Sequence, residues 1–235
     1  SSTIEGMAEA CNALKIPVVS GNVSFYNETH GIHIYPTPIV GMVGILDDIR
    51  VRVGTGFLRE GDKIALLFPA DEEALNARCA HEYVWILTNR EGGEAPPISL
   101  DNEVAVQRFC RKIAGKGLLR SAHDLSEGGL GIAVAESCLA SPKGLLGATV
   151  RLPEGKGRLD GRLFGESASR ILISSSPNFF SRVSNEAARE KIACLEIGTV
   201  LERALRIEDP GGRPLVDIEM DEMQDIWSGA LSEII

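Results

Sequence analysis

The sequence predicts an α+β fold in mixed α/β layers, with a partial amino-terminal sheet domain at residues 1–54 and a larger α+β domain at 55–235. Candidate strands and helices follow one another without the regular alternation of a doubly wound sheet. A charged, glycine-containing stretch around residues 50–60 separates two sets of apolar runs. The chain has 235 residues, of which 44% are hydrophobic, enough to bury one good core and part of a second.

The amino-terminal part offers one helix and two strands. Apolar residues at helical spacing predict a helix over 4–14, which Pro17 ends. Residues 18–26 indicate a strand interrupted by a glycine, and 39–46 indicate a second strand after a proline-containing turn. These elements are less than a complete layer, so we expect an apolar face that another domain or a second copy covers.

The carboxy-terminal part begins with a turn at Gly61-Asp62 and a strand over 63–68. A helix is expected over 71–87, a loop over 91–97 and an amphipathic helix over 101–114. Further along, the apolar patterns predict a helix over 130–140, another over 177–189, and strands near 148–152, 170–174, 191–200 and 204–208.

The stretch Ala122-His-Asp-Leu-Ser-Glu-Gly-Gly-Leu130 stands at the start of one of these helices. Ser126 is a suitable cap, and the glycines that follow would let an anion approach the backbone N–H groups of the first turn. Asp124 lies where Mg²⁺ would bridge a carboxylate to phosphate oxygens. The pattern therefore indicates a phosphate site, although an ordinary capped helix after a turn has the same pattern.

Charge and cysteine usage restrict the partners. The net charge of −9 argues against nucleic acid or an anionic membrane, since both attract clustered lysine and arginine. Five cysteines are scattered without a Cys-x-x-Cys pair, as expected in a reducing compartment. The sequence has no apolar run long enough to cross a bilayer, and we expect a cytoplasmic protein.

Three segments carry a resemblance to a known family: Pro17-Val-Val-Ser-Gly-Asn-Val-Ser-Phe-Tyr-Asn27, Ala122–Leu130 and Phe164-Gly-Glu-Ser-Ala-Ser-Arg170. The chain resembles the carboxy-terminal part of the synthetase subunit of phosphoribosylformylglycinamidine synthases. The resemblance implies that residues 1–54 are the remainder of an amino-terminal-type sheet domain. It also implies that residues 55–235 form a domain like the carboxy-terminal one of aminoimidazole ribonucleotide synthetase.

The resemblance further implies an ATP-dependent ligase of purine biosynthesis. In that reaction ATP phosphorylates the amide oxygen of formylglycinamide ribonucleotide, and ammonia from glutamine displaces the phosphate to give the amidine. The implied cofactors are ATP and Mg²⁺. The implied partners are a glutaminase subunit, a small accessory subunit, and either the rest of the synthetase chain or a homodimer mate.

Residue roles implied by the resemblance fall on two motifs. In the first, Gly21 would contact ATP, Asn22 would bind Mg²⁺ and Ser24 would contact the substrate, although a bulged strand and a turn explain the same residues. In the second, Asp124 would hold Mg²⁺ and Ser126 would touch the nucleotide of an auxiliary site.

No catalytic residue is assigned, because the family's catalytic histidines lie in the half that this chain does not match. The fragment alone is therefore expected to be inactive. The alternative is a catalytically silent module that a nucleotide stabilises for subunit assembly. His123 is either a general base or, as we favour, a packed or hydrogen-bonded side chain. A Glu166–Arg170 ion pair is the simplest account of the third motif.

Overall fold

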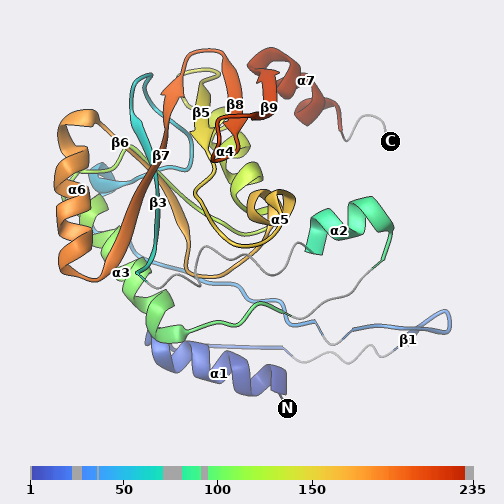
Figure 1. Ribbon diagram of the computed structural model, residues 1–235. Coiled ribbons are helices and arrows are strands. Elements are labelled where there is room, and N and C mark those ends of the chain that lie inside the picture. The colour runs from blue at the N-terminus through green and yellow to red at the C-terminus, as the bar shows by residue number, and fades with distance from the viewer. Residues whose placement is uncertain (1, 23–27, 36, 71–80, 91–94, 231–235) are drawn as a thin grey trace. The chain divides into compact units, whose positions relative to one another are not determined.

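The computed structural model describes residues 2–22, 28–35, 37–70, 81–90 and 95–230 (Figure 1). The chain divides into two units, Ser1–Ile49 and Arg50–Ile235. None of the helices formed by the described residues is long and apolar enough to cross a bilayer.

The first unit contains one helix and a minimal hairpin. The helix α1 spans Ser2–Leu14, which confirms the predicted helix. The strands β1 (Glu28–Thr29) and β2 (Ile32–His33) pair antiparallel around Gly31, whose positive φ of 80° suits the turn.

The strand predicted over 39–46 is not found, and residues 23–26 of the strand predicted over 18–26 lie outside the described residues. Residues 39–46 form no strand, and the described part of 18–26, residues 18–22, forms none either. A strand is defined by hydrogen bonds to a neighbouring strand, and within the described part of this unit β1 and β2 pair only with each other. The apolar pattern is present in 39–46, but the described residues supply no pairing strand for it.

The second unit is built on a seven-stranded sheet with the order β4-β6-β3-β7-β5-β8-β9. Only β5 and β8 run parallel, and the other neighbouring pairs are antiparallel. The strands are β3 (Lys63–Pro69), β4 (Ser121–Asp124), β5 (Gly147–Arg151), β6 (Ile171–Ser175), β7 (Ile192–Leu201), β8 (Ala204–Glu208) and β9 (Pro214–Glu219).

The remaining elements of the described chain are helical: η1 (Ile49–Val51), α2 (His81–Thr88), α3 (Leu100–Gly115), α4 (Gly129–Leu139), α5 (Leu159–Phe164), α6 (Pro177–Arg189) and α7 (Met220–Gly229). Helices α3 and α6 cover one face of the sheet, and α4 packs on the other with α5 and α7 (Figure 1). The predicted α+β fold is confirmed.

Most predicted elements of this unit are confirmed by β3, β5, β6, β7, β8, α3, α4 and α6. The helix expected over 71–87 is helical from residue 81, and residues 71–80 lie outside the described residues, as do 91–94 of the expected loop. The sequence analysis missed β4, β9, α5 and α7, which are short elements without a long apolar period.

Two cores hold the second unit together. On the α3/α6 face, Phe109 and Ile113 of α3 are fully buried in a cluster that includes Leu67 and Ile173 of the sheet. On the other face, the cluster contains Leu130 and other residues of α4. Fully burying a large apolar side chain contributes about 1.5–3 kcal/mol, so the sheet is anchored from both sides.

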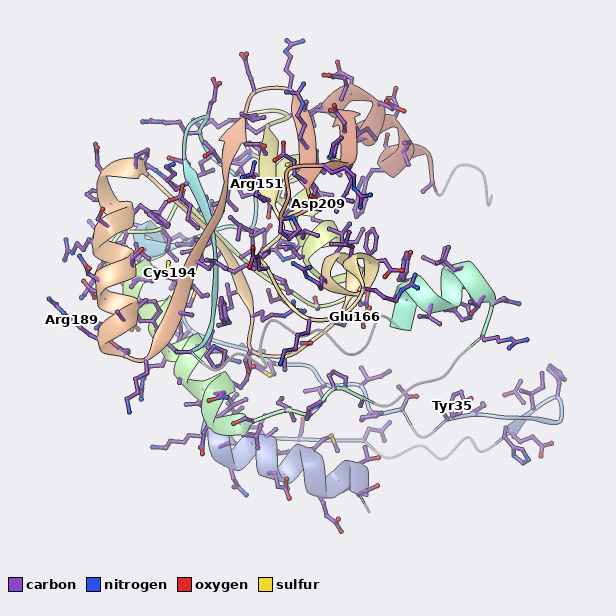
Figure 2. The ribbon with its side chains drawn as sticks, in the orientation of Figure 1. Tyr35, Arg151, Glu166, Arg189, Cys194 and Asp209 are labelled. Carbon is purple, nitrogen blue, oxygen red and sulfur yellow. The ribbon has the colours of Figure 1, made fainter. Side chains whose placement is uncertain are left out.

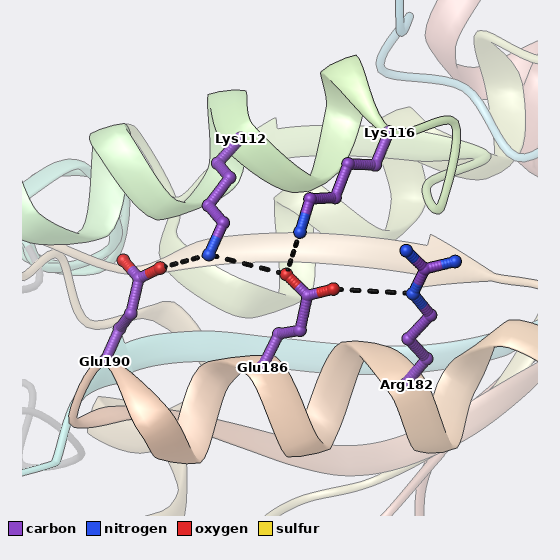
Figure 3. Close-up of polar contacts among 5 residues, drawn as sticks. All are labelled: Lys112, Lys116, Arg182, Glu186 and Glu190. Atoms are coloured by element: carbon purple, nitrogen blue, oxygen red, sulfur yellow. Dashed lines mark hydrogen bonds and ion pairs between the residues drawn. The ribbon is translucent and has the colours of Figure 1, made fainter.

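A group of charged side chains joins α3 to α6 (Figure 3). Glu186 of α6 is mostly buried, and its Oε2 accepts a 2.5 Å hydrogen bond from Lys116 Nζ. Lys112 Nζ lies 3.5 Å from the same oxygen and 2.5 Å from Glu190 Oε1. The Lys116 ammonium is the main cause that lowers the pKa of Glu186 below its ordinary value.

Candidate functional site

The sequence-predicted site residues are divided between the two units. Gly21 and Asn22 lie in the first unit, where both are exposed, and Ser24 lies outside the described residues. A Cβ at Gly21 would meet no atom within 4 Å. Packing against the described residues therefore does not explain glycine at this position.

Asp124 and Ser126 lie in the second unit, on the turn that links β4 to α4. Asp124 ends the strand, and the Ser126 carbonyl accepts a 3.1 Å hydrogen bond from the Gly129 N–H. The Ser126 side chain was expected to cap the helix, and this expectation is wrong. Gly128 holds the cap position, with a φ of 72° and no side-chain cap bond.

The two glycines of this turn are required by the fold itself. Gly129 has a φ of +61°, and a Cβ there would lie 2.5 Å from the Gly165 carbonyl oxygen. A Cβ at Gly128, whose φ is also positive, would lie 2.3 Å from Ile132 Cγ1. Side chains rarely tolerate either condition, so the positive φ angles and close packing against Gly165 and Ile132 account for this pair of glycines.

The loop after α5, which carries the third motif, packs against the same turn. Glu166, labelled in Figure 2, accepts a 3.1 Å hydrogen bond from the Gly128 N–H through Oε1. The Leu125 N–H donates to the Arg170 carbonyl at 3.1 Å. Two motifs that lie about forty residues apart therefore form one structural unit, and an internal carboxylate already engages a backbone donor at the start of α4.

The expected Glu166–Arg170 ion pair is replaced by backbone contacts. The Arg170 guanidinium is buried, and its Nη2 donates to the Gly165 carbonyl at 2.7 Å. Its Nε donates to the Ser167 carbonyl at 3.3 Å. Burial lowers the pKa of Arg170 to about 10, because desolvation disfavours the charged form. Arg170 thus holds the loop in shape, while Glu166 turns towards Gly128.

Ser169 of the same loop ties it to the other face of the sheet. Its hydroxyl donates a 2.6 Å hydrogen bond to Glu103 Oε2 of α3, and Gln107 donates to the second oxygen of Glu103. The sequence analysis singled out the loop but missed both Glu103 and the Glu166–Gly128 bond. Gly165, beside Glu166 in the sequence, was the available signal of a close backbone approach.

His123 is held in place by its neighbours. Its Nδ1 lies 2.7 Å from the Asp124 carbonyl oxygen, and its Nε2 lies 3.1 Å from Glu136 Oε2 on α4. Only 13% of the side chain is exposed. This is the packed, hydrogen-bonded state that the sequence favoured over a general base.

The Asp124 carboxylate suits a hard cation, and the neighbouring Glu127 is a second exposed carboxylate on the same turn. Its side chain is 75% exposed, which leaves its oxygens accessible. Among the described residues no cluster of three or more His, Cys, Asp or Glu side chains is placed to hold a metal. One accessible carboxylate is sufficient for a Mg²⁺ ion that takes its other ligands from phosphate and water, so the donor set fits a nucleotide-borne cation.

Comparison with protein families matches most of the second unit. Residues 59–209 match the model of the AIR synthase related protein, C-terminal domain. The chain belongs to this family. Residues 1–46 match the model of the corresponding N-terminal domain.

Curated relatives extend the match over nearly the whole chain. The phosphoribosylformylglycinamidine synthase subunit PurL of Moorella thermoacetica is 42% identical over 224 residues, which is 95% of this chain and 29% of that protein. The PurL subunit of Thermomicrobium roseum is 41% identical over 98% of this chain and 30% of its own length. The resemblance seen in the sequence is confirmed, and the chain spans about a third or less of these relatives.

Solved structures show the same fold. T. maritima PurL complexed with FGAR aligns with a TM-score of 0.71 and 19% identity over 94% of this chain and 36% of that one. T. maritima PurL complexed with ATP aligns with a TM-score of 0.68 and 20% identity, over 94% of this chain and 34% of that one. At this level of identity the likeness concerns the fold.

Proposed function

We propose that this chain is part of an ATP-dependent C–N ligase that converts formylglycinamide ribonucleotide to formylglycinamidine ribonucleotide, with ammonia that originates from glutamine. The observation that carries the proposal is the 42% identity to a PurL subunit over 95% of the chain. Homologous structures described as complexes with FGAR and with ATP support the substrate and the nucleotide.

In this proposal the two units correspond to the two domains expected from the sequence. Residues 1–54 are the remainder of an amino-terminal-type sheet domain, and residues 55–235 are the carboxy-terminal-type domain. The division of the structure between Ile49 and Arg50 and the matches to two family models support this assignment.

The residues of this chain contribute binding contacts. Asp124 would hold Mg²⁺ and Ser126 would contact the nucleotide of an auxiliary site, while Gly21 would contact ATP, Asn22 would bind Mg²⁺ and Ser24 the substrate. The cation would supply positive charge that offsets the phosphate oxygens. The accessible Asp124 carboxylate and the exposure of Gly21 and Asn22 support these roles.

The proposed partners are a glutaminase subunit, a small accessory subunit, and the rest of a synthetase chain or a second copy of this one. A homologous structure described as PurLQS of Thermotoga maritima supports assembly with other subunits. A purine-biosynthetic role of this kind is consistent with a cytoplasmic location.

A second candidate function is a nucleotide-stabilised structural module. The Glu166–Gly128 bond favours it, because this bond joins the turn at the start of α4 to the loop after α5 and so gives the site a structural role. Such a module would bind ADP with Mg²⁺ and gain thermal stability without turnover.

Calorimetric titration of the chain with ADP and with ATP, each with Mg²⁺, tests the nucleotide site. Asp124→Ala should abolish the binding if that carboxylate holds the cation. Asp217→Ala is the matched control, because this exposed carboxylate lies on β9, at the opposite edge of the sheet, where it pairs with Arg206 of β8. Binding that survives Asp124→Ala would contradict the assigned role of Asp124.

A phosphate-release assay separates the two functions. We expect no phosphate above background when ATP, ammonia and formylglycinamide ribonucleotide are added to the chain alone. We expect turnover when the missing part of a related PurL chain is supplied. If ADP binds but the reconstituted protein remains silent, the structural module is favoured.

A further inference from the structure

A pocket of ≈ 500 Å³ opens beside the edge strand β4 of the second unit, between β4, α4 and α7. It is lined by His123 and Glu136, by Leu139 and its neighbour near the end of α4, and by residues of α7 that include Gln224 and Trp227. Asp124, the proposed cation ligand, is not among its lining residues. The volume falls in the range of small-molecule sites.

The walls of the pocket are held by backbone contacts. Segment 54–57 runs beside the start of β4, where the Ala122 N–H donates to the Gly54 carbonyl at 3.0 Å. The Phe57 N–H donates to the Ser137 carbonyl of α4 at 2.8 Å. A Cβ at Gly56 would lie 2.1 Å from the Ala140 carbonyl oxygen, so glycine is needed for this close approach. Thr55, which lines the pocket, is thereby fixed in position.

Helix α7 forms the other wall because its buried face is anchored. Met220 and Met223 lie in the core beneath α4, at 2% and 9% exposure. Trp227, one turn further along, is 57% exposed and lines the pocket. An exposed tryptophan on a firmly packed helix offers a flat surface for stacking.

The chemistry of the lining excludes a phosphate group. Neither lysine nor arginine contributes to the pocket, and Glu136 would repel an anion. A single aromatic ring is also unlike the aromatic cages that bind organic cations. Glu136 Oε2 lies 3.1 Å from His123 Nε2, and the carboxylate keeps further lone pairs for a ligand. A neutral, planar ligand with hydrogen-bonding edges fits best.

We propose that this pocket binds a purine base of the guanine type, presented as a base or nucleoside. The Glu136 carboxylate can accept from the adjacent ring and exocyclic N–H donors of such a base. The amide of Gln224 and the hydroxyl of Thr55 can donate to its O6 and N7 acceptors. Stacking on Trp227 supplies the affinity that the open pocket otherwise lacks. This site goes beyond the proposed ligase function and uses residues separate from Asp124.

Intrinsic fluorescence gives a direct test, since the chain has two tryptophans. The variant Trp85→Phe leaves Trp227 as its one reporter, and the matched variant Trp227→Phe leaves Trp85, which lies on α2 outside the pocket. Guanosine should quench the Trp227 reporter saturably, with a Kd at or below about 1 mM. Guanosine should not change the fluorescence of the Trp85 reporter.

The specificity of the pocket is tested in the Trp227-reporter protein. Glu136→Gln keeps the side-chain shape and should weaken guanosine at least about tenfold, with circular dichroism to confirm folding. Adenosine, which lacks two adjacent donors, should bind at least about tenfold more weakly. GMP should bind no more tightly than guanosine.

The absence of saturable quenching in the folded protein would overturn the proposal. Equal binding of adenosine, much tighter binding of GMP, or binding of tetramethylammonium in place of guanosine would overturn it as well. Unchanged affinity in Glu136→Gln would also overturn it, because the carboxylate is the group that selects the base.

Discussion

The two units of this chain have similar apolar patterns but different burial. No described residue of 2–49 is buried, whereas residues 50–235 contain two buried clusters on opposite faces of one sheet. Ile39 and Val43 are 98% and 100% exposed, and Ile64 and Phe109 are fully buried. An apolar run thus becomes a buried strand only where the same chain supplies its neighbours.

Segment 39–46 of the first unit is both apolar and exposed. A contiguous apolar segment of this kind marks an interaction surface in a folded protein. The family model for the N-terminal domain covers residues 1–46, and the relatives are about three times longer than this chain. Under the proposed function, the rest of a synthetase chain or a second copy would cover this segment.

The largest expected effect comes from truncating a buried ring in the second unit. Phe109→Ala should lower the free energy of unfolding by about 3–5 kcal/mol, because it removes buried surface and leaves a cavity. Val43→Ala, in the first unit, should change it by less than about 0.5 kcal/mol. Urea denaturation measures both. A large effect at Val43 would show that a partner covers this segment in solution.

A smaller loss of stability is expected when a glycine of the β4–α4 turn is replaced. Gly129→Ala places a side chain at positive φ against the Gly165 carbonyl oxygen and should cost about 1–3 kcal/mol. Gly41→Ala, where a Cβ meets no atom within 4 Å, is the control in the first unit and should be close to neutral. Thermal melting of the two variants compares them, and equal melting temperatures would contradict the packing of the turn against the loop.

The smallest loss of stability is expected when a side chain of the charged group between α3 and α6 is replaced. The pKa of Glu186 is lower in the folded chain than its ordinary value. The Glu186 carboxylate therefore contributes its full stabilisation at pH values above the ordinary pKa. The contribution is lost as the pH falls through the lowered pKa. Glu186→Gln should therefore reduce stability at neutral pH and flatten the acid limb of the stability profile.

A substitution of Lys116, which follows the last residue of α3, tests whether this lysine causes the lowered pKa of Glu186. Lys116→Gln should raise the pKa of Glu186 towards its ordinary value, because it removes the main partner of that carboxylate. Stability at neutral pH and at acid pH can be followed by urea denaturation. An acid limb that is steeper in Glu186→Gln than in the unmodified chain would contradict the assignment.

The sequence by itself determined the elements whose signal is local. The helices α1, α3 and α6 show a sustained apolar period, α4 is apolar nearly throughout, and β3, β5, β6, β7 and β8 are apolar runs between turn residues. The glycine-rich turn and the motif of the following loop were also visible, because each has an unusual local composition. The α+β class follows from the order of these elements.

Only the tertiary structure decided how those signals are used. Gly128 replaced Ser126 at the start of α4 because Glu166 and Gly165, far along the chain, pack against that turn. Arg170 turned to backbone carbonyls because it is buried in the same loop. The apolar segment 39–46 formed no strand because strand formation needs a partner at hydrogen-bonding distance. Local sequence specifies which conformation a segment favours, and long-range contacts specify whether that conformation is completed.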